Sequence, residues 1–335
     1  MNQGNSFDRQ TTVRLFGREF PVLDRVVVEN RTYLLLERLS SGQRERYLGL
    51  GSSGMQSRLP VAIMILPGAI DCQHLRALQR LTDSNSHLPA ILGCERRGDR
   101  TLVVQKWIRG TPLSEYLTRM REGRLPRITP PLAWQRIRGL AHGLRWLHNL
   151  RHIVHGDIKP DNIIVARDPG RFYLIDYGSA WGIERTATRD SGDGISPVYA
   201  APELQNGARG VSIRCDQFSL SVILYQLLTM QVPYANFGGQ AGRPEFVAQM
   251  RTSLRMLSEL AAGDFPIPRS IWQGIDEVVS KGLSLDPDER FPTPELWLRA
   301  LDEVDYSMRW PTILSPTQER LTRVVRWVAN RLGWQ

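Results

Sequence analysis

The stretch HGDIKPDN, residues 155–162, lies between two short apolar segments, HIV and NIIV. It places an aspartate, a lysine and an asparagine, Asp157, Lys159 and Asn162, close together in one loop. Asp176 follows at the end of the apolar run FYLI, and a later segment reads Ala-Pro-Glu. Any one of these residues could simply cap a loop. All of them in this order indicate a catalytic constellation.

These segments resemble the Hanks-type (eukaryotic-like) serine/threonine protein kinase family, whose catalytic loop reads HRDxKxxN and is followed by DFG and APE. The second and third motifs read Asp176-Tyr177-Gly178 and Ala201-Pro202-Glu203 here. The resemblance covers roughly residues 31–303. It implies an α+β, two-lobed fold with a small antiparallel β lobe and a larger helical lobe. It also implies transfer of the ATP γ-phosphate to a protein hydroxyl.

The resemblance assigns roles to the four polar residues, and these roles suit phosphoryl transfer, which depends on positioning and charge neutralisation. Asp157 and Lys159 match the catalytic pair, in which the carboxylate accepts or orients the hydroxyl proton and the ammonium lies near the transferred phosphate. Asn162 and Asp176 match the ligands of Mg²⁺, a hard cation that prefers oxygen. A lysine two residues after the aspartate is typical of the serine/threonine branch. The implied cofactors are ATP and Mg²⁺.

Further matches follow the catalytic loop. Ser196 and Tyr199 resemble the substrate-facing segment before the Ala-Pro-Glu motif, with Ser196 in the place of a threonine. Asp216 matches the aspartate of a buried central helix that holds the backbone of the catalytic loop. Arg290 matches the arginine that pairs with the glutamate of Ala-Pro-Glu, here Glu203. The resemblance gives Asp216, Glu203 and Arg290 structural roles.

Gly156 is a departure from the family pattern, because an arginine that binds an activation-loop phosphate usually stands at this place. A phosphate on that loop would lack one of its charged partners, so activation by loop phosphorylation is less expected. A second interpretation is that glycine eases the local backbone.

The nucleotide-binding part of the small lobe departs further. Residues 40–45 take the place of the glycine-rich phosphate loop, and only Gly42 is retained. The segment GLGSSG, residues 49–54, spells the glycine pattern. We interpret it as a strand end and a hairpin turn, because a phosphate loop there would leave too few residues for the next strand. The residues that match nucleotide-binding positions of the family are Leu39, Ser40, Gly42, Tyr47, Ala62, Met64, Gln105, Lys106 and Ile108.

Met64 stands where the third strand of the lobe should carry a lysine that contacts the α- and β-phosphates. The helix glutamate that pairs with this lysine is also absent, and His74 lies about where it belongs. Losing one preorganised charge near developing negative charge costs roughly 3 kcal/mol, or about 10²–10³ in rate. The activity is therefore expected to be reduced or atypical.

Few cations are left to replace that lysine. Of the 43 basic residues only three are lysines, Lys106, Lys159 and Lys281, and none of them substitutes easily. Arginine is the available stand-in, from Arg44, Arg46 or Arg58. An arginine fork holds phosphate, but with a geometry that differs from the point charge of lysine.

Composition bounds the class of protein. The 335 residues are 41% hydrophobic and 23% charged, which is typical of a soluble globular chain. Three cysteines without a pattern argue against a disulfide framework and a zinc site, and favour a reducing, cytoplasmic setting. No apolar run is long enough for a transmembrane helix, and the first residues do not form a signal peptide pattern.

Patterning divides the chain into four parts. They are an amino-terminal extension with extra strands on the small lobe (1–30), the small lobe (31–108), the large lobe (109–304) and a basic amphipathic helix (305–335). Short β-branched and aromatic runs predict strands in the small lobe. Apolar spacing predicts helices over 72–82, from Leu132 onward, and over 216–230, 244–262, 270–282 and 294–304.

The carboxy-terminal segment and the net charge of the chain indicate which kinds of partner it binds. The pattern of residues 315–335 predicts a helix with an apolar stripe flanked by arginines. We expect this helix to pack on the large lobe or on a partner protein. A second interpretation is peripheral contact with a membrane surface, which tryptophan and arginine suit. The net charge is +9, but without clustered basic and aromatic residues a nucleic acid is not favoured. We expect a protein substrate or binding partner.

Three classes of function are compatible with these motifs. A serine/threonine protein kinase with an atypical nucleotide site is favoured by the four polar residues of the motifs. A pseudokinase, acting as a nucleotide-sensing or scaffolding module, is favoured by the methionine at position 64. A small-molecule phosphotransferase typically lacks the activation segment, so residues 179–203 argue against it. We favour the kinase, because a scaffold alone would not need all four polar residues.

Overall fold

The computed structural model describes most of the chain. The described residues are 12–40, 45–52, 58–67, 87–151, 153–167, 170–176, 181–182, 196–205, 212–249 and 253–309. Gly42, Arg44 and the helices predicted over 72–82, with His74, and over 315–335 lie outside them. Within these ranges, no helix is both long and apolar enough to cross a membrane.

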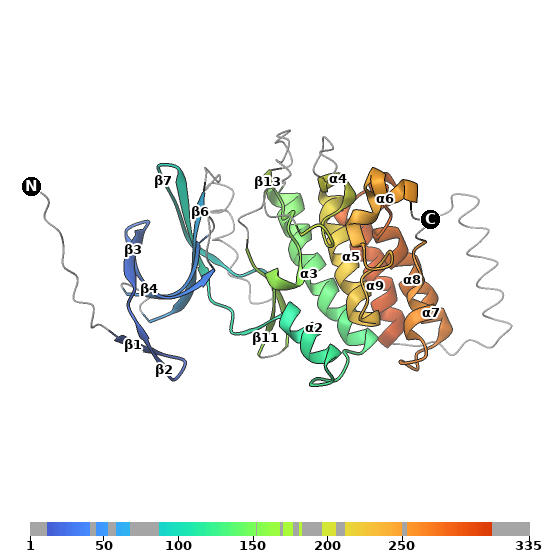
Figure 1. The fold of residues 1–335 in the computed structure, drawn as a ribbon, viewed down its shortest axis with the longest axis horizontal. Helices are drawn as coiled ribbons and strands as arrows, with labels where there is room; N and C mark the ends of the chain where they lie inside the picture. Colours follow the sequence, from blue (N-terminus) through green and yellow to red (C-terminus); the bar gives the residue numbers. More distant parts are fainter. Residues whose placement is uncertain are drawn as a thin grey trace, which may run out of the picture. The chain divides into compact units, whose positions relative to one another are not determined.

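A six-stranded antiparallel sheet occupies the amino-terminal part, in the order β3-β4-β5-β6-β8-β7 (Figure 1). Its strands are β3 (Asp24–Val28), β4 (Arg31–Ser40), β5 (Glu45–Gly51), β6 (Pro60–Pro67), β7 (Ile91–Arg97) and β8 (Arg100–Lys106). β-branched and aromatic side chains favour such strands, and one face packs around the fully buried Tyr33, Ile63 and Val104. The antiparallel sheet predicted for the small lobe is therefore present.

The residues before β4 contribute strands of two kinds. β1 (Thr12–Leu15) and β2 (Arg18–Pro21) form a separate two-stranded hairpin. β3 instead pairs with β4 and becomes an edge strand of the large sheet. At the turn of the β1–β2 hairpin, the guanidinium of Arg109 lies 4.7 Å from the ring centroid of Phe16. The extension therefore supplies one hairpin and also one strand of the sheet itself.

Two glycines of GLGSSG, Gly49 and Gly51, belong to strand β5. Gly49 lies inside β5, where a Cβ would come within 2.5 Å of the Cδ1 atom of Ile63. Gly51 ends the strand, donates to the carbonyl of Leu59 and accepts from the N–H of Arg58. This pattern closes the β5–β6 pair, in agreement with the interpretation of the segment as a strand end and a turn. Close approach of the neighbouring strand requires glycine at position 49.

Two small sheets contribute strands on either side of the candidate catalytic loop, residues 155–162. β9 (Gly110–Pro112), β11 (Ile163–Ala166) and β12 (Phe172–Leu174) form a three-stranded antiparallel sheet. β10 (Ile153–Val154) pairs with β13 (Trp181–Gly182). The apolar runs HIV, NIIV and FYLI predict β10, β11 and β12. The short 3-10 helix η2 (Pro160–Asn162) leads directly into β11.

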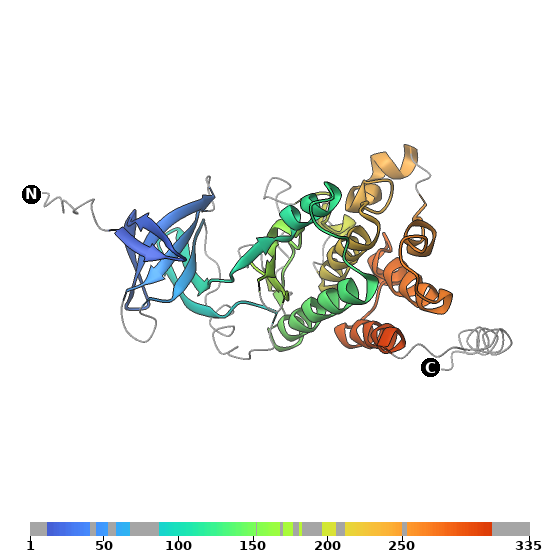
Figure 2. The same cartoon turned by 90° about the horizontal axis from the view of Figure 1, so that it is seen from below.

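The carboxy-terminal part is mainly helical. The described helices are α2 (Leu113–Arg121), α3 (Pro130–Arg151), α4 (Pro202–Gln205), α5 (Ile213–Thr229), α6 (Pro244–Gln249), α7 (Leu257–Ala261), α8 (Arg269–Gly282) and α9 (Pro294–Arg309), with 3-10 helices η4 (Gly238–Gly242) and η5 (Pro287–Glu289). Every residue of α5 from Cys215 to Thr229 is buried, so this helix is covered on all its sides. α8 packs against both α5 and α9, as Figures 1 and 2 show.

The single helix predicted over 244–262 is wrong. α6 and α7 are separate, and residues 253–256 are not helical. The hydroxyl of Tyr225 donates to the carbonyl of Arg255 in this break, and the carboxylate of Asp276 accepts the N–H of Ser258 at the start of α7. These two bonds from distant elements replace the bonds of a continuous helix, so a local apolar pattern does not reveal the break.

One further helix and one helix boundary differ from the prediction. α2 was not predicted, although its buried Leu113, Leu117 and Met120 have helical spacing. α9 continues to Arg309, past the predicted boundary at residue 304. Asp305, which is buried, forms an ion pair with Arg309 one turn later and extends the helix. The tail predicted to begin at 305 therefore starts inside α9.

The chain divides into two compact units. The first contains Met1–Tyr116, His142–His155 and Pro160–Arg185, and the second contains Leu117–Ala141, Gly156–Lys159 and Thr186–Gln335. The first unit therefore includes β9, β11 and β12, which lie within the range predicted for the large lobe, 109–304. Asn162 and Asp176 belong to the first unit, and Asp157 and Lys159 belong to the second.

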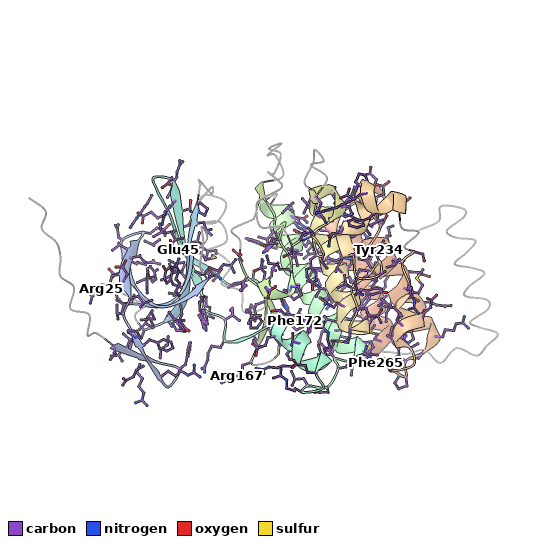
Figure 3. The ribbon with its side chains drawn as sticks, in the orientation of Figure 1. Arg25, Glu45, Arg167, Phe172, Tyr234 and Phe265 are labelled. Carbon is purple, nitrogen blue, oxygen red and sulfur yellow. The ribbon has the colours of Figure 1, made fainter. Side chains whose placement is uncertain are left out.

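The buried hydroxyl of Tyr234 is expected to make the free energy of unfolding depend on pH in the alkaline range. The side chain of Tyr234 is labelled in Figure 3. Its buried hydroxyl donates a 2.6 Å hydrogen bond to the carbonyl of Leu283. Burial raises the pKa of Tyr234 to about 12, so between pH 10 and 12 the unfolded chain loses this proton first. The contribution of the protonated Tyr234 hydroxyl to the free energy of unfolding is complete below about pH 10 and is lost as the pH rises toward 12. We expect it to fall by about 1.4 kcal/mol by pH 11.

Urea unfolding of the wild type and of Tyr234→Phe at pH 9 and pH 11 measures this loss. The variant lacks the titrating hydroxyl, so its unfolding free energy should decrease less between the two pH values. Equal decreases in the two proteins would contradict the prediction.

Candidate active site

The loop after β10 carries the first candidate residues, and its backbone is anchored before Asp157. The N–H of Gly156 donates a 2.9 Å hydrogen bond to Oδ1 of Asp216 in α5, which is the backbone contact expected of this aspartate. The Nε2 atom of His155 lies 3.2 Å from the carbonyl oxygen of Ile175. His155 and Asp216 are both fully buried. These contacts fix the chain immediately before the candidate catalytic aspartate.

Gly156 has a φ of +72°, in the left-handed region that side chains with a Cβ disfavour. This supports the interpretation that glycine eases the backbone of the loop. We expect Gly156→Ala to lower the free energy of unfolding by about 1–2 kcal/mol, because the Cβ would crowd the carbonyl in this conformation. Thermal unfolding measures the loss. Gly263→Ala is the matched control, because a Cβ there meets no atom within 4 Å. Equal melting temperatures for the two variants would argue against strain at Gly156.

Asp157 and Lys159 are in direct contact. The Nζ atom of Lys159 donates to Oδ2 of Asp157 at 2.9 Å. The side chain of Asp157 is 4% exposed and that of Lys159 is 18% exposed. A carboxylate held in this way accepts a hydrogen bond from a hydroxyl group, and the neighbouring ammonium offsets negative charge. The two residues predicted to act as the catalytic pair are therefore brought together.

Asn162 and Asp176 are tied together through the backbone. Asn162 ends η2, Asp176 follows β12, and the N–H of Ile175 donates to the carbonyl of Asn162 at 2.8 Å. Both candidate metal ligands are buried, and Asp176 has a φ of +70°, which aspartate tolerates better than most residues. An amide oxygen and a carboxylate are hard oxygen donors, so this donor set fits Mg²⁺.

The predicted nucleotide-binding residues of the six-stranded sheet do not all lie on the same face. Met64 of β6 lies opposite Arg46 of β5 and Val103 of β8. Ala62 lies opposite Leu48 of β5 and Gln105 of β8. Directly opposed residues of antiparallel strands share a face, and so do residues two positions apart along a strand. Ala62, Met64 and Gln105 therefore share one face, together with Arg46 and Leu48.

Tyr47 lies on the other face, so its predicted place among the nucleotide-binding residues is wrong. It is opposite Ile63 and packs against the buried cluster around Tyr33 and Val104. Leu48 instead shares the face of Ala62, and no motif in the sequence singles it out. In a strand, a shift by one residue moves a side chain to the opposite face. The register of β5 against β6 shows that Leu48, and not Tyr47, lies on the face of Ala62.

The remaining nucleotide-binding candidates lie at strand ends and in the segment after β8. Leu39 is exposed near the end of β4, and Ser40 is paired with Arg46 across β4 and β5. Lys106 is exposed, and its N–H donates to the carbonyl of Ala90. The Oε1 atom of Gln105 is buried and has no hydrogen-bond partner among the described residues. Ile108 is half-buried after β8.

Only one of the three candidate arginines meets a site residue in the described part of the chain. The guanidinium of Arg46 forms an ion pair with the carboxylate of Asp176. Arg58 is exposed at the β5–β6 hairpin, with a φ of +67°. Arg44 lies outside the described residues. Arg46 is therefore the cation that the structure brings to the candidate metal ligand.

The candidate substrate-facing segment is held by hydrogen bonds within the second unit. The carbonyl of Ser196 accepts the N–H groups of Tyr199 and Ala200. The hydroxyl of Tyr199 donates to Oε1 of Gln226 in α5 at 3.0 Å. The side chain of Gln205 donates to the carbonyl of Ala200. The segment is therefore fixed on both sides of Tyr199.

The Ala-Pro-Glu motif is joined to the rest of the unit through Glu203. Arg290 donates to both carboxylate oxygens of Glu203, at 2.6 and 2.9 Å, which is the pairing expected of these two residues. Arg290 also donates to the carbonyls of Ser284 and Arg214. Burial raises the pKa of the Cys215 thiol well above its usual range, so this thiol stays protonated and donates to Glu203.

Comparisons with known proteins identify the family of this chain. A family model described as the protein kinase domain matches residues 73–299. Ribosomal protein S6 kinase alpha-4 of Homo sapiens is 30% identical over 269 residues, which cover 74% of this chain and 32% of that protein. Serine/threonine-protein kinase PrkC of Bacillus subtilis is 24% identical over 280 residues, which cover 78% of this chain and 40% of that protein.

A solved structure supports the fold. The PK-1 kinase of the Cydia pomonella granulovirus matches with a TM-score of 0.62 at 18% identity, over 80% of this chain and 93% of that one. The chain belongs to the Hanks-type serine/threonine protein kinase family and has its α+β, two-lobed fold. It spans 32% of the length of the human relative and 40% of that of the bacterial one.

Proposed function

We propose that this chain transfers the γ-phosphate of ATP to a serine or threonine hydroxyl of a protein, from a nucleotide site that lacks the usual lysine. Membership of the protein kinase family supports the reaction class. The contact between Lys159 and Asp157 carries the proposal, because it joins a buried carboxylate to a cation at the expected spacing. A fold used only for scaffolding does not require this pair.

The chemistry of each residue follows from its position. The acceptor hydroxyl donates a hydrogen bond to Asp157, which orients it and takes its proton as the new oxygen–phosphorus bond forms. The bond from the γ-phosphorus to the bridging oxygen breaks, and ADP leaves with that electron pair. Lys159 offsets the negative charge on the transferred group. Asn162 and Asp176 would hold Mg²⁺, which supplies charge neutralisation for the phosphate oxygens.

Nucleotide recognition falls to the first unit. Ala62, Met64, Gln105 and Leu48 share the sheet face, and the segment from Lys106 to Ile108 follows it directly. An apolar face with few polar groups suits an adenine ring. Leu39, Ser40 and Gly42 complete the proposed nucleotide-binding set, with Gly42 outside the described residues.

Radiolabelled ATP tests the reaction. Purified full chain, Mg²⁺ and a general acceptor protein should give labelled phosphoserine or phosphothreonine. Asp157→Ala should abolish the signal above a buffer control. Label transfer that is unchanged by this substitution would overturn the assignment of Asp157.

A pseudokinase is the second candidate, and a specific observation favours it. Met64 replaces the lysine, and the carboxylate of Asp176 is engaged by Arg46. A nucleotide-sensing or scaffolding module would then bind a protein partner without transferring phosphate. Thermal unfolding with ATP and Mg²⁺ separates the forms, because a ligand that binds the native state raises its melting temperature. Saturable stabilisation without label transfer would favour the nucleotide-sensing form.

The proposed location is the cytoplasm, with a protein as substrate or partner and with no role for nucleic acid. The basic segment 315–335, outside the described residues, would contact either a partner helix or a membrane surface. Cosedimentation with anionic vesicles, comparing the full chain with a chain ending at residue 314, tests the membrane contact. Equal sedimentation of the two chains would contradict it.

A further inference from the structure

Arg46 stands beside the position where the lysine is missing. It lies directly opposite Met64 in the pairing of β5 with β6, so the two side chains share one face of the sheet. Neighbouring strands are about 4.8 Å apart, which a long arginine side chain spans. A cation on β5 can therefore serve the same space as a lysine on β6.

The surroundings of Arg46 show that its charge is directed to the candidate metal ligand. Its guanidinium pairs with Asp176, whose side chain is 2% exposed, while that of Arg46 is 31% exposed. The two residues are 130 positions apart in the chain, so this contact is a product of the fold. Without the guanidinium, the buried carboxylate of Asp176 would lose a cationic partner, which is unfavourable.

Arg46 also has donor capacity left. Its Nε atom is buried and has no hydrogen-bond partner among the described residues. A guanidinium carries five N–H donors in a planar fork that suits phosphate oxygens. A buried donor that makes no bond is unfavourable, so a phosphate oxygen that reached it would be bound tightly. Met64, with 2% exposure, offers no charge at the neighbouring position.

We propose that Arg46 makes the cationic contact to the nucleotide phosphates that the lysine at position 64 makes in related kinases, and that it pairs with Asp176 when no nucleotide is bound. This inference rests on the proposed function and names the residue that completes its nucleotide site. The positive charge has moved from β6 to the adjacent strand β5, on the same face.

Binding of ADP without Mg²⁺, measured by calorimetry, tests the contact without relying on catalysis. Arg46→Met should weaken ADP binding by about tenfold to a hundredfold, because a hydrogen bond between charged groups is lost. Arg46→Lys should bind better than Arg46→Met, since a charge remains. The double variant Arg46→Met with Met64→Lys should regain most of the affinity, because it returns the cation to β6.

Arg100→Met is the matched control. Arg100 lies on β8 of the same sheet and pairs with Glu45 (labelled in Figure 3) rather than with a site residue. Its removal should change ADP affinity by less than about threefold. If Arg46→Met does not fold, as judged by its melting curve, the double variant is compared with the wild type instead, and a folded double variant that binds ADP at least about tenfold more weakly would still overturn the inference.

The outcomes separate this inference from the proposed function. Two outcomes would overturn only the role of Arg46. One is wild-type ADP affinity in Arg46→Met, and the other is a folded double variant that does not regain affinity. Phosphate transfer by the wild type would still stand in that case. A wild type that binds no ADP would overturn the nucleotide site, and the role of Arg46 with it.

Discussion

Asp157→Asn should lower the rate of phosphate transfer by about 10²–10⁴-fold, the usual contribution of a positioned general base. Asparagine has nearly the same shape and still accepts a hydrogen bond from Lys159, which contacts this side chain at 2.9 Å. It cannot take the hydroxyl proton. The fold and the nucleotide affinity should therefore persist while the chemical step fails. Initial rates at saturating ATP, together with ADP affinity, measure the two effects separately.

Asp161→Asn is the matched control for this substitution. Asp161 is a carboxylate of the same loop, but its side chain is exposed. It should keep the rate within about threefold of the wild type, because an exposed charge contributes little. A similar loss of rate in both variants would mean that loop charge, rather than a base at position 157, governs the reaction.

Arg290→Ala should destabilise the folded protein by about 3–5 kcal/mol, which is the range for breaking a buried ion pair. The side chain of Arg290 is 0% exposed, and Glu203 is 10% exposed. Removing the guanidinium leaves the carboxylate buried without its main partner and deprives the carbonyls of Ser284 and Arg214 of their donor. The contact of Arg290 with the ring of Phe218 is lost as well. Urea unfolding followed by circular dichroism measures the change.

Two further variants serve as controls for the loss of stability in Arg290→Ala. Arg299→Ala removes an exposed arginine that pairs with Glu303 at 3.4 Å on the surface of α9, and it should cost only about 0–1 kcal/mol. Adding Glu203→Gln to Arg290→Ala should recover part of the stability, because no unpaired charge then stays buried. Equal costs for Arg290→Ala and Arg299→Ala would refute a structural role for the buried pair.

Residues close together in the chain were predictable. Asp157 and Lys159 are separated by one residue, and their contact lies within one short loop. Asn162 leads directly into β11, so its place follows from the apolar run after it. Residue type and spacing carry most of the information in such a loop, because the short chain leaves few alternative geometries.

Pairing between strands was not predictable to the residue. Tyr47 and Leu48 are neighbours in β5, and both are compatible with a strand. Their faces depend on the register against β6, and a shift by one residue exchanges them. The break between α6 and α7 has the same origin, because Tyr225 and Asp276 stabilise it from other helices.

The amino-acid sequence is enough to establish the family, the α+β class and the residue types available for chemistry, including the methionine at position 64. These follow from local motifs and from side-chain periodicity, which act over a few residues. The tertiary structure alone decided that Arg46 shares a face with Met64 and contacts Asp176. That arrangement joins positions 130 residues apart, and only strand register and packing bring such distant side chains together.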